Sequence, residues 1–220
     1  MIYKILLTIW MNLIIAAVFL YIEPAAGFPG EVSRILFFHV PMAWVATLAF
    51  LLSMIASSVY LITRKVNADF LAQSSAELGF LFCFLATVTG SIFAKATWGS
   101  FWNWDPRQTS IVMLLMIYGA YFVLRSAVAD HEKRRVFAGV YSILAFCTVP
   151  FLVFIVPRIT NSLHPEDTLN PAKPGMDIKT LIFFLGSLCA YTGLFVWMLR
   201  LKVRMLRIMD KERGRINFHK

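Results

Sequence analysis

Six long apolar stretches, separated by short charged segments, constrain the fold of this chain more than any other feature. They cover approximately residues 5–22, 41–62, 78–95, 109–129, 136–156 and 180–200. About 20 apolar residues in a helix cross the roughly 30 Å hydrocarbon core of a bilayer. The 220 residues are 59% hydrophobic and 15% charged, which leaves too few polar residues to cover a water-soluble surface. We therefore predict an all-α, polytopic membrane protein in which residues 1–220 form a single domain of about six transmembrane helices.

Two of the predicted spans allow a second interpretation. The first, near the N-terminus, resembles the apolar region of a signal peptide, but the segment after it is a poor cleavage site, and we interpret it as a span. The second could begin as early as Ser33, in which case Pro41 would form a kink inside the helix. The three cysteines all lie within apolar stretches and are expected to pack as small hydrophobic residues.

Lys and Arg are unequally distributed between the two sides of the predicted bundle. Fifteen lie on the side that carries both termini, and six lie on the other side. Because cytoplasmic segments carry an excess of Lys and Arg, we predict that both termini are cytoplasmic. The basic tail, residues 201–220, supplies much of this excess and is expected to contact anionic lipid. The net charge of +9 therefore indicates membrane anchoring and not nucleic-acid binding.

A dense aromatic segment occupies the second of the three predicted extracytoplasmic loops, which are 23–40, 96–108 and 157–179. Three of the six tryptophans, Trp98, Trp102 and Trp104, fall within seven residues, together with Phe101. Tryptophans that only mark the membrane interface are usually scattered among the span ends. The density of this segment favours a flat, apolar surface for a large planar ligand.

The aromatic segment is followed by the pattern of a helix N-terminus. Asp105 occupies the N-cap position, Pro106 the first helical position and Gln108 the third, as in a capping box. Asp105 is thus expected to fix how the aromatic loop enters the next helix. For Arg107 the residue chemistry leaves two alternatives, namely extension toward lipid headgroups or a bidentate contact with a ligand carboxylate.

Two of the four histidines, His39 and His164, fall in predicted extracytoplasmic loops, and each lies close to a proline. The other two histidines lie among charged residues on the cytoplasmic side. A single loop histidine is most often an ordinary polar residue, whereas two imidazoles beside an aromatic surface match the axial pair of six-coordinate haem iron. Zinc is an alternative, because Glu166 and Asp167 follow His164 closely.

The aromatic segment resembles the tryptophan-rich WWD signature of the haem-handling proteins of cytochrome c biogenesis. Within that superfamily, the length and the order of loops are most similar to the CcmC family. The resemblance implies that haem b, iron protoporphyrin IX, is bound at the extracytoplasmic face with His39 and His164 as axial ligands. The residues of the signature, which would contact the porphyrin, are Trp98, Gly99, Phe101, Trp102, Trp104, Asp105 and Arg107.

The resemblance also implies a location and a set of partners. The location is the cytoplasmic (inner) membrane, with a multi-pass chain whose active face is extracytoplasmic. The partners are haem, a periplasmic haem chaperone (CcmE-like), ABC transporter subunits (CcmA- and CcmB-like), a small membrane subunit (CcmD-like) and membrane lipid. The implied function is delivery of haem to the chaperone, with no catalytic residue assigned, so that we expect a haem-binding platform more than an enzyme.

Three other functions are compatible with a polytopic haem-binding chain. A permease subunit of an ABC-type haem exporter would need ionisable or strongly polar residues at mid-membrane, where only Asn12, Thr87 and Thr89 are weak candidates. A component of a system II-type cytochrome c synthase would resemble the larger members of the superfamily. A b-type cytochrome anchor would carry its histidines inside the spans, and no histidine falls inside a predicted span.

Overall fold

The computed structural model describes residues 2–23, 30–164 and 177–218, and within these ranges the chain forms helices and no strands. In chain order the elements are α1 (Ile2–Leu20), a 3-10 helix (Gly30–Ile35), α2 (Leu36–Thr63), α3 (Val66–Trp98), α4 (Pro106–Ala127), α5 (His131–Pro150), a π-helical segment (Phe151–Ile155), α6 (Val156–Ile159) and α7 (Ile178–Phe218). Six helical segments are long and apolar enough to cross a membrane. The predicted all-α class and the six spans are therefore confirmed.

Two spans begin more than ten residues earlier than the sequence predicts. The second span starts with the 3-10 helix at Gly30 and continues through α2, so that Pro41 lies inside a helix, in agreement with the earlier of the two predicted starts. Helix α3 begins at Val66 and not near residue 78, and Asp69 and Glu77 are consequently helical. Charged residues are tolerated in these extra turns because ion pairs with neighbouring helices satisfy them.

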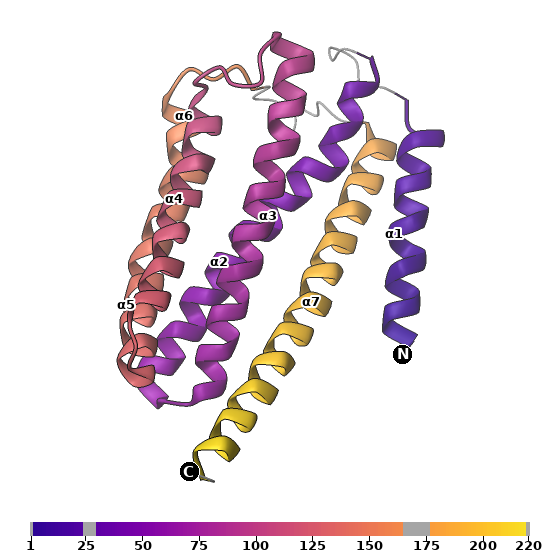
Figure 1. The fold of residues 1–220 in the computed structure, drawn as a ribbon. Coiled ribbons are helices and arrows are strands. Elements are labelled where there is room, and N and C mark those ends of the chain that lie inside the picture. Colours follow the sequence, from indigo (N-terminus) through magenta and orange to yellow (C-terminus); the bar gives the residue numbers. More distant parts are fainter. Residues whose placement is uncertain (1, 24–29, 165–176, 219–220) are drawn as a thin grey trace.

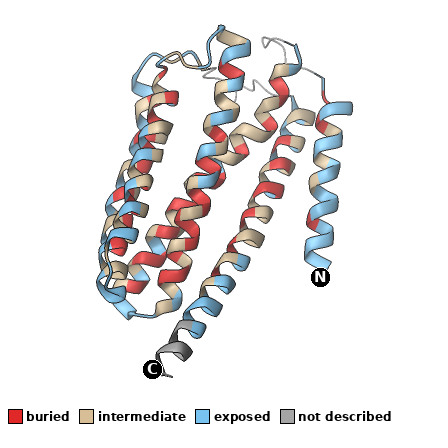
Figure 2. Cartoon of the chain, viewed as in Figure 1, coloured by how far each residue is buried: buried red, intermediate tan, exposed pale blue. Residues whose placement is uncertain are grey.

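The helices form an elongated bundle in which α2 and α3 pack together, with α4 and α5 on one side and α7 and α1 on the other (Figure 1). Buried residues follow the inward faces of these helices (Figure 2). Near the middle, the rings of Phe50 and Tyr118 stack with centroids 3.6 Å apart and join α2 to α4. The outward faces carry exposed hydrophobic residues, as expected where lipid is the solvent.

Helix α1 contacts the bundle through a seven-residue repeat shared with α7. The Tyr3 hydroxyl donates to the carbonyl of Gly193 at 2.6 Å, and the Trp10 indole N–H donates to the carbonyl of Gly186 at 3.0 Å. A Cβ atom at Gly186 would lie 2.8 Å from Ile14 Cδ1, so the end of the Ile14 side chain occupies the space that glycine leaves. Small residues allow membrane helices to pack closely without a hydrophobic driving force.

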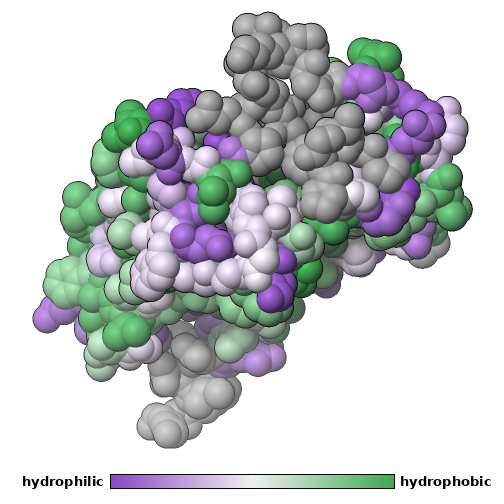
Figure 3. Space-filling model, turned by 90° about the horizontal axis from the view of Figure 1, so that it is seen from above, coloured by the Kyte–Doolittle hydropathy of each residue, from purple (hydrophilic) through white to green (hydrophobic). Residues whose placement is uncertain are grey.

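The two ends of the bundle carry different parts of the chain. The start of α2, the end of α3, the start of α4 and the end of α6 meet at the upper end in Figure 1, whereas both termini point to the lower end. All predicted site residues lie at the upper end, which we call the site end. Seen from this end, hydrophilic and weakly polar residues gather on the described surface, and hydrophobic residues lie toward its sides (Figure 3). Which end faces the cytoplasm stays a prediction.

Candidate functional site

His39 is positioned by α2 and α3, and not by a loop as the sequence predicted. It lies in the first turns of α2, because the helix starts at Leu36, before Pro41. Its Nδ1 atom is 3.1 Å from the Thr89 hydroxyl, and a Cβ atom at Gly90 would lie only 2.8 Å from the ring carbon Cε1. The missing side chain at Gly90 therefore makes the space that the imidazole occupies.

The hydrogen bonds around Thr89 assign the tautomer of His39. The Thr89 hydroxyl donates its single hydrogen to the Leu85 carbonyl at 2.8 Å, so its oxygen accepts a hydrogen bond from His39 Nδ1–H. A neutral imidazole that is protonated at Nδ1 has an unprotonated Nε2. That nitrogen is able to coordinate a metal.

His164 is held in an equivalent way, by a carboxylate. Its Nδ1 atom lies 3.0 Å from Asp105 Oδ1, and its backbone N–H donates to the Ser162 hydroxyl at 3.1 Å. Burial lowers the pKa of His164 below its ordinary value, although Asp105 opposes this effect, and Arg107 lowers the pKa further. The imidazole is therefore neutral at neutral pH, with Nδ1 donating to Asp105 and Nε2 available.

Asp105 joins the aromatic loop to the segment that carries His164. Its buried carboxylate accepts from the Arg107 N–H at 2.9 Å, the Leu163 N–H at 2.7 Å and the Ser162 hydroxyl at 2.9 Å. Burial alone would raise the pKa of Asp105, but the donors from Leu163 and Arg107 outweigh it and hold the pKa below its usual value. Asp105 is thus an anion, and its predicted N-cap role in α4 is confirmed.

The predicted capping box is not formed, because the Gln108 side chain braces the loop instead. Its carbonyl oxygen accepts from the Asn103 backbone N–H at 2.9 Å, and its amide donates to the Phe101 carbonyl at 3.3 Å. The Ser100 hydroxyl donates to the Trp102 carbonyl at 3.0 Å. Gln108 is a site residue that sequence reasoning assigned only to capping. The sequence feature that could have identified it is its position three residues after the N-cap Asp105.

The aromatic side chains divide into two groups. Trp98 lies beside His164, with ring centroids 4.9 Å apart, and contacts Phe93 edge to face. Trp102 and Trp104 contact each other with an interplanar angle of 83°, so these two rings do not form the single flat surface that the sequence predicted. Edge-to-face contacts are favoured because the positive edge of one ring meets the negative face of the other.

Trp104 combines exposure with an unusual backbone conformation. Its side chain is 77% exposed, and its φ of 55° lies in the left-handed region, which is uncommon for a bulky residue. Phe101 is 57% exposed and lies beneath the Lys95 ammonium. Gly99, with φ 82°, ends α3 and turns the chain into this loop. The loop thus presents two large aromatic residues on the surface.

The structure brings most predicted site residues into one region. His39 contacts Thr89 and His164 contacts Trp98, both in the last three turns of α3, and Arg107 is exposed beside the Asp105 cap. Glu166 and Asp167, the additional zinc ligands that the sequence suggested, lie outside the described residues. Within the described ranges, no group of three or more His, Cys, Asp and Glu side chains forms a metal site. A pair of imidazoles fits a haem iron, which needs only two axial ligands.

Fold and site define a class of protein, namely a six-span membrane protein with two histidines and a tryptophan-rich loop at one end. Within that class, the chain belongs to the heme exporter protein C family, whose sequence model matches residues 1–218. It is 33% identical over 194 residues to heme exporter protein C of Bradyrhizobium diazoefficiens, covering 84% of this chain and 73% of the relative. The protein of the same name from Haemophilus influenzae is 30% identical over 183 residues, with coverage of 83% and 74%. A ccmC-like mitochondrial protein of cytochrome c biosynthesis from Marchantia polymorpha is 28% identical over 179 residues, with coverage of 80% and 75%.

Proposed function

We propose that this protein binds haem b at the extracytoplasmic face of the inner membrane and presents it to a periplasmic haem chaperone. Family membership supports a role in cytochrome c maturation and haem handling by a multi-pass membrane protein. The observation that supports haem binding at this site is the hydrogen bonding of the two histidines. His39 and His164 each have Nδ1 engaged by a protein group, which leaves both Nε2 atoms for the iron of the cargo.

Each proposed ligand has its own supporting partner. Ligand histidines in metalloproteins almost always donate their second ring N–H to a carboxylate, a carbonyl or water, which fixes the ring and makes the other nitrogen more basic. Asp105 provides a carboxylate for His164, and Thr89 provides a hydroxyl for His39. The His164 nitrogen is therefore the more basic of the two, and we expect its bond to iron to be the stronger.

The aromatic loop would orient the porphyrin. Trp98 restricts the rotation of the His164 ring, while the exposed rings of Trp104 and Phe101 are available to the porphyrin or its receiver. We assign Arg107 to a haem propionate, because a guanidinium binds a carboxylate bidentately. The protein then supplies position and electrostatics, whereas the bond to haem forms on the chaperone.

The remaining partners follow from the family. The name heme exporter protein C supports assembly with an ABC-type exporter, whose subunits we take to be CcmA- and CcmB-like. A CcmD-like small membrane subunit and a CcmE-like chaperone complete the proposed set. The chaperone would dock at the site end, where Trp104 and Phe101 are exposed.

Presentation can be separated from binding by replacing Trp102 or Trp104 with Ala. A misplacement of about 1 Å can cost roughly a hundredfold in a positioned reaction. Haem transferred to the chaperone, divided by the amount of inserted protein, should therefore fall far more than haem content. Phe137→Ala, at an exposed position of α5 near the opposite end of the bundle, is the control and should leave transfer per inserted molecule unchanged. Normal transfer per inserted molecule in both loop variants would contradict the proposed presentation.

A further inference from the structure

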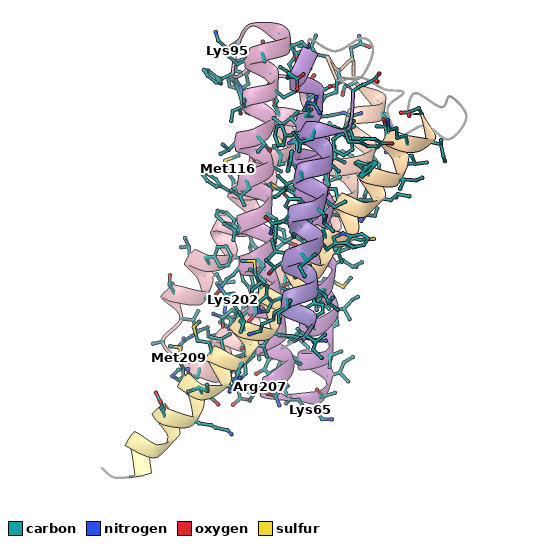
Figure 4. All side chains as sticks on the ribbon, turned by 90° about the vertical axis from the view of Figure 1, so that its right-hand side faces the viewer. Lys65, Lys95, Met116, Lys202, Arg207 and Met209 are labelled. Atoms are coloured by element: carbon teal, nitrogen blue, oxygen red, sulfur yellow. The ribbon has the colours of Figure 1, made fainter. Side chains whose placement is uncertain are left out.

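A second cluster of charged residues lies at the end of the bundle opposite to His39 and His164. A cavity of about 200 Å³ opens there between the start of α3, the end of α4, the start of α5 and residues 206–210 of α7. Figure 4 shows Lys202 and Met209 near this end, with Lys95 at the far end. The 33-residue α3 joins the two ends and is roughly 50 Å long at 1.5 Å per residue. The cavity is therefore separate from the proposed haem site.

The base of the cavity is a neutral ion pair. The guanidinium of Arg125 forms two hydrogen bonds to the buried carboxylate of Asp69, at 2.8 and 3.0 Å, and a third to the Gln73 side-chain carbonyl at 2.9 Å. Such a bidentate pair satisfies both groups. The charges of Asp69 and Arg125 therefore cancel, and the net charge of the cavity depends on the residues of its wall.

Two further arginines on α5 form that wall. Arg134 donates from Nε and Nη2 to the carbonyls of Val128 and Ala129, which fixes its guanidinium and leaves Nη1 available. Arg135 lies 3.5 Å from Asp69 and 3.5 Å from Asp210, distances longer than those of good hydrogen bonds. Two arginines against the carboxylate of Asp210 leave one surplus positive charge on the wall, without counting His131, which also lines the cavity.

The opposite wall is apolar. Leu206 and Met209 of α7 and Phe70 of α3 line the cavity beside the arginines. A ligand that fits must therefore combine an anionic head with an apolar body. The last turn of α4 and the first turn of α5 border the cavity, so it lies at the level where the hydrophobic spans end.

We infer that this cavity binds the headgroup of an anionic phospholipid, with the phosphate held by Arg134 and Arg135. A phosphate diester matches the planar donor array of arginine, and its single charge equals the surplus on the wall. The acyl chains would continue along Leu206 and Met209. The bilayer that surrounds the chain supplies such a lipid, and basic cavities between membrane helices bind anionic headgroups. The inference is independent of haem binding.

Lipid retention tests this inference directly. Full-length protein, stripped of lipid in detergent, is mixed with phosphatidylglycerol, phosphatidylethanolamine or inorganic phosphate, and bound lipid is counted by native mass spectrometry. Phosphatidylglycerol should be retained in preference to the other two, and Arg134→Gln or Arg135→Gln should each weaken its retention roughly fivefold. Lys133→Gln, which changes the same charge on the same helical turn outside the cavity, should behave as the wild type.

A variant that keeps every charge separates the cavity from general electrostatics. Leu206→Trp should fill the cavity and reduce phosphatidylglycerol retention as strongly as the arginine variants, with haem content unchanged. Three results would overturn the inference: equal loss in Lys133→Gln, equal retention of phosphatidylethanolamine, or displacement of the lipid by an equal concentration of inorganic phosphate. Full retention in Leu206→Trp contradicts it even if the arginine variants fail to fold.

Discussion

Replacing Asp105 with Asn removes the negative charge beside His164 while keeping the size and shape of the side chain. Asn has the same shape and is also a good N-cap residue, so α4 should still begin at Pro106. The amide has one acceptor oxygen, however, where the carboxylate has two oxygens that receive the donors of Arg107, Leu163, Ser162 and His164. Arg107 and His164 share Oδ1, so an amide oxygen in that position keeps the cap and still accepts from His164 Nδ1. The NH2 group then faces the Leu163 N–H and the Ser162 hydroxyl, and His164 loses its anionic partner.

The expected loss follows from the lost carboxylate. Removing the outer partner of a metal-ligating histidine costs about ten- to a hundredfold in metal affinity, or roughly 1.4–2.8 kcal/mol at 1.4 kcal/mol per tenfold. We expect Asp105→Asn to weaken haem binding by this factor at near-normal protein levels. Asp105→Ala should also lose the cap, at about 1 kcal/mol of folding stability, and accumulate less in the membrane.

The assay is haem dissociation from purified protein into an excess of a haem-scavenging globin. Asp130→Asn is the matched control, because Asp130 is the N-cap of α5, accepts from the Lys133 N–H at 2.7 Å and has no histidine among its hydrogen-bond partners within the described residues. Asp105→Asn should release haem faster than Asp130→Asn by at least tenfold. Equal release rates would refute the assignment of Asp105 as the support of His164.

Two further predictions concern the membrane. In a background without the native cysteines, Ser100→Cys should react with a membrane-impermeant thiol reagent in intact cells and His131→Cys should not. The reverse pattern would show that the site end faces the cytoplasm. Gly186→Leu should separate α1 from α7 and lower the thermal stability of the purified protein, because Ile14 already occupies the space. The control Gly119→Leu should have little effect, because a Cβ atom there meets nothing within 4 Å.

Local signals in the sequence were sufficient for the spans and for the cap. Apolar length identified six membrane helices, and the order Asp105-Pro106 identified the start of α4, because these features depend on neighbouring residues alone. The start of α2 depends on more than local signals. Pro41 suggested a boundary, but a 3-10 helix precedes α2 and the chain continues through the proline, which placed His39 in a helix.

The contacts that support the two histidines were not predictable from one sequence. Asp105 meets His164, and Thr89 meets His39, across 59 and 50 positions of the chain. Residue types alone do not specify such pairs, since the packing of α2 on α3 and the return of the chain after α6 bring them together. The perpendicular arrangement of Trp102 and Trp104 likewise depends on backbone conformation.

The central claim is that His39 and His164 are the axial ligands of bound haem. The most direct test is the absorption spectrum of the purified, haem-loaded protein, oxidised and after dithionite, for the wild type and for His39→Ala, His164→Ala and the control His131→Ala. We predict a six-coordinate, low-spin spectrum for the wild type and for His131→Ala. The other two variants should lose haem or become high-spin, and added imidazole should restore the low-spin spectrum in each. An unchanged low-spin spectrum in both His39→Ala and His164→Ala would contradict the proposed site.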